Sequence, residues 1–360
     1  MDAKHELQRA FRERADGIAT NGAPLVGLFG DGIPAPLLHA AGGFCADIKA
    51  PPLADATDGP KIDLVDEIAE SFLDEFTTRF LHRFAAGAFD HFAIIIFARD
   101  DVAGLAAYQY ASELRRQNMV SRKGPVLHLW NLAHTDTDAA RTYNLTELTR
   151  LIGVLAEQGL VVDDNELKAA LSVEKERRKA VDQIACNGAN RFVYRAAGRW
   201  LSPNAHLAAL SALPAEKPVS AETRIGLVGT ACDDISLREI CSEIGTLQAD
   251  LMPFGDVWGY DISTATDAET LIHAIATDPL NIRANPAENF GAALQSRLEN
   301  CDLVVSAVDH NDDSFGWEVP RIRDQAHAKG ARFIDLGFVP FRPSNAWISQ
   351  TKQRVLESLQ

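Results

Sequence analysis

Short apolar runs alternate with amphipathic stretches along the chain, and this alternation constrains the fold more than any other feature. The runs FAIIIFA (Phe92–Ala98) and DLVVSAV (Asp302–Val308) have the length and composition of strands buried on both faces of a parallel sheet. The stretches between such runs place apolar residues at helical spacing. Strands that alternate with helices are typical of βαβ units. The sequence therefore predicts an α/β fold built from doubly wound parallel sheets.

The chain has 360 residues, which suits two domains at roughly 100–200 residues each. We predict an N-terminal α/β domain over residues 1–141, with strands near 24–30, 91–97 and 124–132, one more strand after the first helix, and one long helix over 67–89. A helical connector is expected over 142–220, where two helices flank Gly159 and Asp163 or Asp164 provides an N-cap. Because three prolines punctuate the end of this connector, a second α/β domain is expected over 221–360.

Charge and composition exclude several classes of function. The formal net charge is −15, and 46% of the residues are hydrophobic. A nucleic acid or an anionic membrane would need a basic face, so neither is an expected partner. The N-terminus is charged and unlike a signal peptide, and no apolar run approaches the ~20 residues of a membrane span. We therefore expect a soluble, cytoplasmic protein.

Neither the cysteines nor the glycine-bearing turns match a ligand-binding motif. The five cysteines form no CxxC pair, which argues against a zinc ribbon and a disulfide framework. The turns GLFGDGIP and GLVGTACDD each follow a predicted strand, but the first lacks the GxGxxG spacing and the second lacks a Walker lysine. We expect free thiols and tight turns, and no nucleotide site at these glycines.

Charged residues follow two of the predicted strands. Asp100 and Asp101 end the first run, and Asp309 and His310 end the second. Open α/β sheets bind ligands at the carboxyl ends of their strands. Carboxylates with an imidazole could bind a divalent metal or act as acid and base. The alternative is that they are solvated loop residues in which an aspartate caps the next helix.

Several of these segments together resemble a known family. The segment VGLFGDGIPAPLLHAAGGF, the strand that ends at Ala98, GPVLHLWNL, RIGLVGT and CDLVVSAVDH are similar to the 2-hydroxyacyl-CoA dehydratase and benzoyl-CoA reductase family, which includes the 2-hydroxyglutaryl-CoA dehydratase-type subunits. The resemblance implies two flavodoxin-like domains and pairs of homologous subunits. It also implies an iron–sulfur cluster held by cysteines and an electron supplied by an ATP-dependent activator.

The family's cluster-ligating cysteines are replaced in this chain. The resemblance implies that a Cys-Asp falls on Asp100 and Asp101, and a Cys-His on Asp309 and His310. An early cysteine expected before the long helix has no counterpart. Iron–sulfur clusters require soft thiolate ligands, whereas carboxylates are hard ligands. We therefore predict no cofactor and no bound metal in this chain, with an iron–sulfur cluster in a homologous partner subunit.

The turn at the start of the first helix is the other candidate site. The family uses this turn near its substrate, and the resemblance therefore implies that Pro34 and His39 line a substrate cleft. As an alternative, His39 is a helix histidine whose hydrogen bonds are satisfied within the fold.

Three functions remain open. The first is a cluster-free subunit of a dehydratase or reductase-like complex that shapes an acyl-CoA site with a homologous partner. The second is a stand-alone enzyme that uses the Asp and His pairs for metal binding or for acid–base work. The third is a ligand-binding or scaffold protein that keeps only the fold, since a fold does not fix a function. We favour the first.

Overall fold

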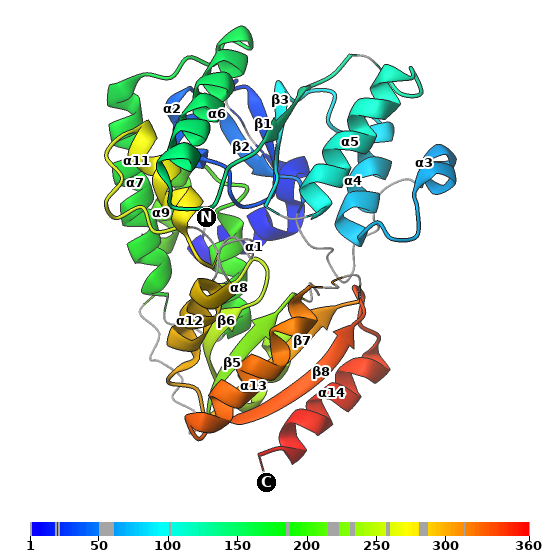
Figure 1. Cartoon of the computed structure of the whole chain (residues 1–360), viewed down its shortest axis with the longest axis vertical. Coiled ribbons are helices and arrows are strands. Elements are labelled where there is room, and N and C mark those ends of the chain that lie inside the picture. Colours follow the sequence, from blue (N-terminus) through cyan, green and yellow to red (C-terminus); the bar gives the residue numbers. More distant parts are fainter. Residues whose placement is uncertain are drawn as a thin grey trace.

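The computed structural model describes residues 2–18, 20, 22–49, 61–100, 102–121, 123–184, 188–214, 223–230, 235–256, 260–280, 287–310, 312 and 314–359. Within these residues lie two four-stranded, all-parallel sheets with helices on both faces (Figure 1). The predicted α/β class with two flavodoxin-like, doubly wound sheets is confirmed.

The first sheet has the strand order β2-β1-β3-β4. Its strands are β1 (Leu25–Phe29), β2 (Phe44–Asp47), β3 (Ile94–Ala98) and β4 (Val126–Trp130). Successive side chains of β3 enter two different cores, since Ile94 and Ile96 face one cluster and Ile95 and Phe97 face the other. All five residues of β3 are buried. The continuous apolar run therefore reflects a strand covered on both faces.

Helices of the first half cover both faces of this sheet. They are α2 (Ala35–Ala40), α3 (Asp63–Ile68), α4 (Glu75–Ala85) and α5 (Val102–Arg116). The single helix predicted over 67–89 is wrong, because the chain breaks between α3 and α4. Asp74 causes the new start, since its carboxylate accepts a hydrogen bond from the Thr77 backbone N–H at 2.9 Å and so caps α4.

Four helices follow the first sheet and form the connecting region. They are α6 (Asp138–Glu157), α7 (Asp164–Asp182), α8 (Gly188–Ala197) and α9 (Pro203–Ser211). Asp163 caps α7 as predicted and accepts from the backbone N–H groups of Asn165 and Glu166. The first helix of the chain, α1 (Ala3–Glu13), and the short 3₁₀ turn η1 (Arg14–Gly17) precede the first sheet. α1 packs its buried Leu7 and Ala10 against α7, α8 and α9.

The second sheet repeats the pattern with the order β6-β5-β7-β8. Its strands are β5 (Arg224–Gly229), β6 (Thr246–Leu251), β7 (Leu303–Asp309) and β8 (Arg332–Val339). Its helices are α10 (Ser236–Ile244), α11 (Ala268–Thr277), α12 (Ala287–Leu298), α13 (Val319–Ala328) and α14 (Asn345–Glu357), with a 3₁₀ turn η2 (Phe315–Trp317) before α13. α10 and α14 pack on one face of the sheet, and α12 and α13 on the other.

One helix of the second half belongs to the core of the first. α11 lies beside α6 and α7 in the upper part of Figure 1, apart from the other helices of the second sheet. Leu271, Ile272 and Ile275 of α11 are buried in the same cluster as Val26 and Ile94 of the first sheet. The predicted domain limits of 1–141, 142–220 and 221–360 stay a prediction, and the two halves share a core.

Candidate functional site

The carboxyl edges of the two sheets face each other. Phe254, three residues after β6, and Phe341, two residues after β8, both pack against Phe76 of α4, with ring centroids 6.2 Å and 5.2 Å apart. Lys49, two residues after β2, lies over the same Phe76 ring. Because open α/β sheets bind ligands outside the carboxyl ends of their strands, the space between these edges is the candidate site.

A buried group of three charges lies at the carboxyl ends of β1 and β2. Arg199 Nη1 lies 2.5 Å from Asp47 Oδ2 and 2.8 Å from Asp31 Oδ1. Its guanidinium also stacks on the Phe254 ring, 4.5 Å from the centroid. Burial raises the pKa of Asp47, and the positive charge of Arg199 opposes that rise. Arg199 therefore ties β1 and β2 to a residue of the second half.

A second buried group lies on one face of α7. Arg177 donates two hydrogen bonds of 2.7 Å to Glu174, and Arg178 donates one of 2.9 Å. Arg178 also donates to the backbone carbonyl of Tyr260, whose hydroxyl donates to the Ile33 carbonyl at 3.3 Å. Burial alone would raise the pKa of Glu174, but the two arginines outweigh it and hold the pKa at about 2.

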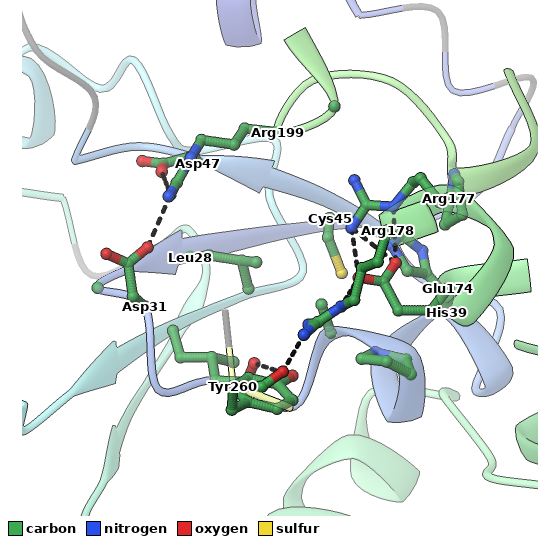
Figure 2. A pocket seen from close by; sticks show the side chains of 16 residues that line it. Leu28, Asp31, His39, Cys45, Asp47, Glu174, Arg177, Arg178, Arg199 and Tyr260 are labelled. Carbon is green, nitrogen blue, oxygen red and sulfur yellow. Dashed lines mark hydrogen bonds and ion pairs between the residues drawn. The ribbon is translucent and has the colours of Figure 1, made fainter. Parts of the chain in front are cut away.

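A small cavity of about 70 Å³ lies between the two charged groups (Figure 2). Cys45 and His39 are among the other residues that line it. His39 Nδ1 lies 3.2 Å from the Gly43 carbonyl oxygen. Burial first, and then the nearby Arg177, lower the pKa of His39 to about 4, so the ring is neutral at pH 7. A neutral imidazole can donate one proton and accept another.

His39 and Pro34 occupy different positions relative to this cavity. His39 lines it, as the resemblance implies, and its hydrogen bond to the Gly43 carbonyl satisfies one ring nitrogen. Pro34 forms the N-cap of α2 and is buried. The residues of the α2 turn that line the cavity are Ile33, Ala35 and Pro36. The substrate-binding role of both residues stays a prediction.

Asp100 closes the turn that follows β1. Its Oδ2 accepts hydrogen bonds from the backbone N–H groups of Asp31, at 2.8 Å, and Gly32, at 3.3 Å. Gly30 makes this approach possible, because a Cβ there would lie 2.9 Å from Asp100 Oδ1, and its φ of 113° disfavours any other residue. Asp101, the other residue of the predicted pair, lies outside the described residues.

Asp309 and His310 lie at the end of β7. The Asp309 N–H donates to Thr230 Oγ1 at 3.1 Å, and Asp309 Oδ1 lies 3.7 Å from His310 Nδ1. The His310 side chain is 46% exposed. Among the residues that the structure describes, no three or more His, Cys, Asp or Glu side chains gather as a metal site would require. The catalytic roles of Asp100, Asp101, Asp309 and His310 stay predictions.

The described donor groups do not fit an iron–sulfur cluster. The three described cysteines are buried in three different hydrophobic clusters, with Cys45 in the first sheet's core and Cys241 and Cys301 on opposite faces of the second sheet. Burial raises the pKa of Cys45 above its ordinary value, which disfavours the thiolate that iron requires. Cys186 and Cys232 lie outside the described residues.

The charged groups that line the cavity are not predicted from the sequence. One signal was present in α7, where Leu167, Leu171 and Val181 form an apolar stripe that Glu174 and Arg177 interrupt on the same buried face. Charged residues within such a stripe indicate a buried ion pair. Nothing comparable marks Asp47 and Arg199, because 152 residues separate them.

Two aromatic residues of the second half, Trp317 and Tyr260, differ in exposure. Trp317 is 85% exposed, whereas Tyr260 is buried at the edge of the cavity. Trp258 lies outside the described residues.

Two doubly wound domains, with a charged cavity at the carboxyl edge of the first sheet that the connecting helices and Tyr260 help to line, define an open α/β protein with a candidate ligand site. The chain belongs to the 2-hydroxyglutaryl-CoA dehydratase D-component family, whose model matches residues 32–355. This confirms the family resemblance and makes the chain a dehydratase-type component. A search of curated proteins finds no match. Within the described residues, no helix combines the length and the apolar character needed to cross a membrane.

Proposed function

We propose that this chain is a cluster-free subunit of a 2-hydroxyacyl-CoA dehydratase or benzoyl-CoA reductase-like complex, and that it shapes an acyl-CoA site together with a homologous partner. Membership of a family named for the D-component of a dehydratase supports a role as one part of a multi-component enzyme. The iron–sulfur cluster then belongs to the partner. This chain contributes the walls of the charged cavity.

Asp100 is the observation that carries the proposal. It takes the position where the resemblance places a cluster ligand, and its carboxylate is engaged with the backbone N–H groups of Asp31 and Gly32. Hydrogen bonds from backbone N–H groups to a carboxylate are charge-assisted, and they stabilise the turn that supplies those N–H groups. Asp100 thus stabilises the turn beside the cavity, so it has a structural role at a position where the resemblance places a cluster ligand.

A native purification tests the proposal. The complex is isolated from its host, its chains are identified by mass spectrometry, and iron, zinc and manganese are measured. We expect a homologous, iron-containing chain at equal stoichiometry, and a colourless preparation when this chain is purified alone. Stoichiometric iron in the isolated chain would contradict the cluster-free role.

Asp309 offers a test of whether the β7 turn takes part. Asp309→Ala removes a half-buried carboxylate whose backbone N–H keeps its bond to Thr230, so we expect the variant to fold. If this turn faces the shared acyl-CoA site, turnover of the assembled complex falls. Asp324→Ala, on the exposed part of α13, is the matched control. Unchanged turnover in the Asp309 variant would remove the turn from the mechanism.

One observation favours the second candidate, a stand-alone metal-dependent or acid–base enzyme. Asp309 Oδ1 lies 3.7 Å from His310 Nδ1, and a neighbouring carboxylate and imidazole are groups that enzymes commonly use as acid and base. The same purification separates the two candidates, since a metal-bound homo-oligomer would favour this enzyme over the supporting subunit.

A further inference from the structure

A second, larger cleft opens beside the small cavity. Its volume is about 1080 Å³, and α7, α8, β6, α11, α12 and the segment 260–264 form its walls. In Figure 1, α7 and α11 lie at the upper left, with α12 below them. Sites for small molecules and cofactors have volumes of roughly 300–1,000 Å³. The cleft is therefore large enough for a nucleotide-sized ligand.

Positive charge gathers in this cleft although the whole chain is acidic. Four aspartates line it together with six cations, which gives a net charge of +2 from these ten residues, against −15 for the chain. The cations are Lys175, Arg178, Lys179, Arg191, Arg195 and Arg297. A local excess of positive charge attracts anionic ligands, even when the chain as a whole is acidic.

Some of these cations already have anionic partners. Asp256 pairs with Arg195 and, at 3.5 Å, with Arg191, and Glu174 pairs with Arg178. The pKa of Asp261 is lowered first by hydrogen bonds from Ser263 and then by the charges of Arg178 and Lys175. Three of the six cations of the cleft, Arg178, Arg191 and Arg195, are thus already paired.

Two exposed cations of the cleft, one from α7 and one from α12, differ from these paired ones. Within the described part of the chain, the side chains of Lys179 and Arg297 form no ion pair, and both residues are exposed. They come from different elements, α7 and α12, on two walls of the cleft. Arginine and lysine are the usual protein partners of phosphate oxygens.

The cleft and the small cavity meet at two residues. Arg178 and Tyr260 line both spaces, so they form the partition between a wide basic cleft and a narrow buried cavity. A ligand with a large anionic end matches the wide cleft in size and in charge, and a narrow end of such a ligand would point towards the small cavity.

We infer that the cleft binds the phosphate groups of a nucleotide-bearing ligand, with Lys179 and Arg297 as phosphate contacts. Coenzyme A is one source of this chemistry, and a free nucleotide such as ATP is the other. The coenzyme A source rests on the proposed function, whereas phosphate binding by the cleft does not.

Isothermal titration of the full chain tests the inference. The probes are coenzyme A, dephospho-coenzyme A, ATP and pantetheine, which carries no phosphate. The test variant is Lys179→Glu with Arg297→Glu. The control is Lys123→Glu with Arg323→Glu, which makes the same charge change at exposed positions outside the cleft. A milder double variant, Lys179→Gln with Arg297→Gln, guards against misfolding, and circular dichroism checks each fold.

We expect coenzyme A to bind and the charge reversal to weaken binding at least about tenfold, with little change in the control and none for pantetheine. Binding should also weaken as salt is raised. If ATP binds as well as coenzyme A and is lost in the same variant, the cleft is a general nucleotide site. Absent binding of all phosphate probes, or equal binding by wild type and both cleft variants, would overturn the inference.

The two proposals fail separately. If the cleft binds none of the phosphate probes, a co-purifying, iron-containing partner would still support the subunit role. Conversely, a chain that purifies without a homologous partner but binds coenzyme A through Lys179 and Arg297 would keep the cleft and reject that role.

Discussion

Glu174 shows how single residues set the character of the cavity. It is 5% exposed and holds two neighbouring arginines of its own helix through hydrogen bonds of 2.7–2.9 Å. Removal of one partner from a buried ion pair leaves an uncompensated charge, which costs far more than loss of an exposed pair. The ionisation of Glu174 is therefore coupled to folding.

Glu174 gives the protein a predictable pH dependence. Its folded-state pKa of about 2 lies below its ordinary value of 4.5. The stabilisation is therefore fully present above about pH 4.5 and is lost as pH falls towards 2. We expect Glu174→Gln to lower the free energy of unfolding by roughly 3 kcal/mol at pH 7, and the difference from wild type to shrink below pH 4.5.

Urea unfolding between pH 7 and pH 3 measures this difference. Glu176→Gln is the matched control, because Glu176 is exposed on the same helix, and it should change stability by less than about 0.5 kcal/mol at every pH. If the difference in free energy of unfolding between wild type and Glu174→Gln stays constant down to pH 3, the ionisation of Glu174 is not coupled to folding.

At the scale of elements, the turn after β6 joins the two halves. Phe254 adopts the left-handed region with φ of 63°, which is unfavourable for a bulky side chain. Its ring nevertheless lies against Phe76 and under the Arg199 guanidinium. The contacts between the halves thus hold this residue in a strained backbone conformation.

This strain predicts an unusual order of stability between two variants. Phe254→Ala and Phe254→Gly both lose the ring, but only glycine relieves the backbone. We therefore expect Phe254→Gly to be more stable than Phe254→Ala by about 1 kcal/mol, although glycine is ordinarily the less stable choice. Urea midpoints of the two variants measure the difference. Ala331, buried directly before β8 and without positive φ, offers the control: Ala331→Gly should be destabilising.

The sequence predicted strands such as β3 and β7 well because each is a nearly continuous apolar run with turns at its ends. Helices whose start is marked mainly by a capping residue were harder to predict. Pro203 is one of the three prolines that predict the end of the connector, and it lies in the first turn of α9, where Ser202 caps the helix and proline is favoured. The capping box of Asp267 and Thr270 similarly begins α11. The turns at glycines and the N-cap at Asp163 were predictable because each depends on local sequence. The pairing of Asp47 with Arg199 depends on the tertiary fold, so local sequence does not indicate it.

At the scale of the whole molecule, α11 makes the two halves one folding unit. Leu271 is fully buried among side chains of the first sheet, α6 and α7, although it lies between β6 and β7 in the chain. Two domains that share a core element cannot unfold independently without exposing that element. The stability of both sheets should therefore respond to changes in α11.

Leu271→Ala tests this coupling. Loss of a buried leucine costs about 2–5 kcal/mol, and we expect the cost to appear equally in both sheets. Amide hydrogen exchange followed by mass spectrometry reports the opening free energies of β3 and β7. Leu356→Ala, at a position 42% exposed in α14, should leave both nearly unchanged. A loss confined to β3 would contradict a shared folding unit.

The path of α11 also sets the order in which a growing chain can fold. The N-terminal core includes Tyr260, Ile262 and Ala276, so it is complete only after those residues have left the ribosome. Domains are generally expected to fold in the order of synthesis. In this chain the first sheet must wait with part of its apolar surface uncovered until most of the protein has been made. A chaperone that protects that surface during translation would therefore act mainly on the first half.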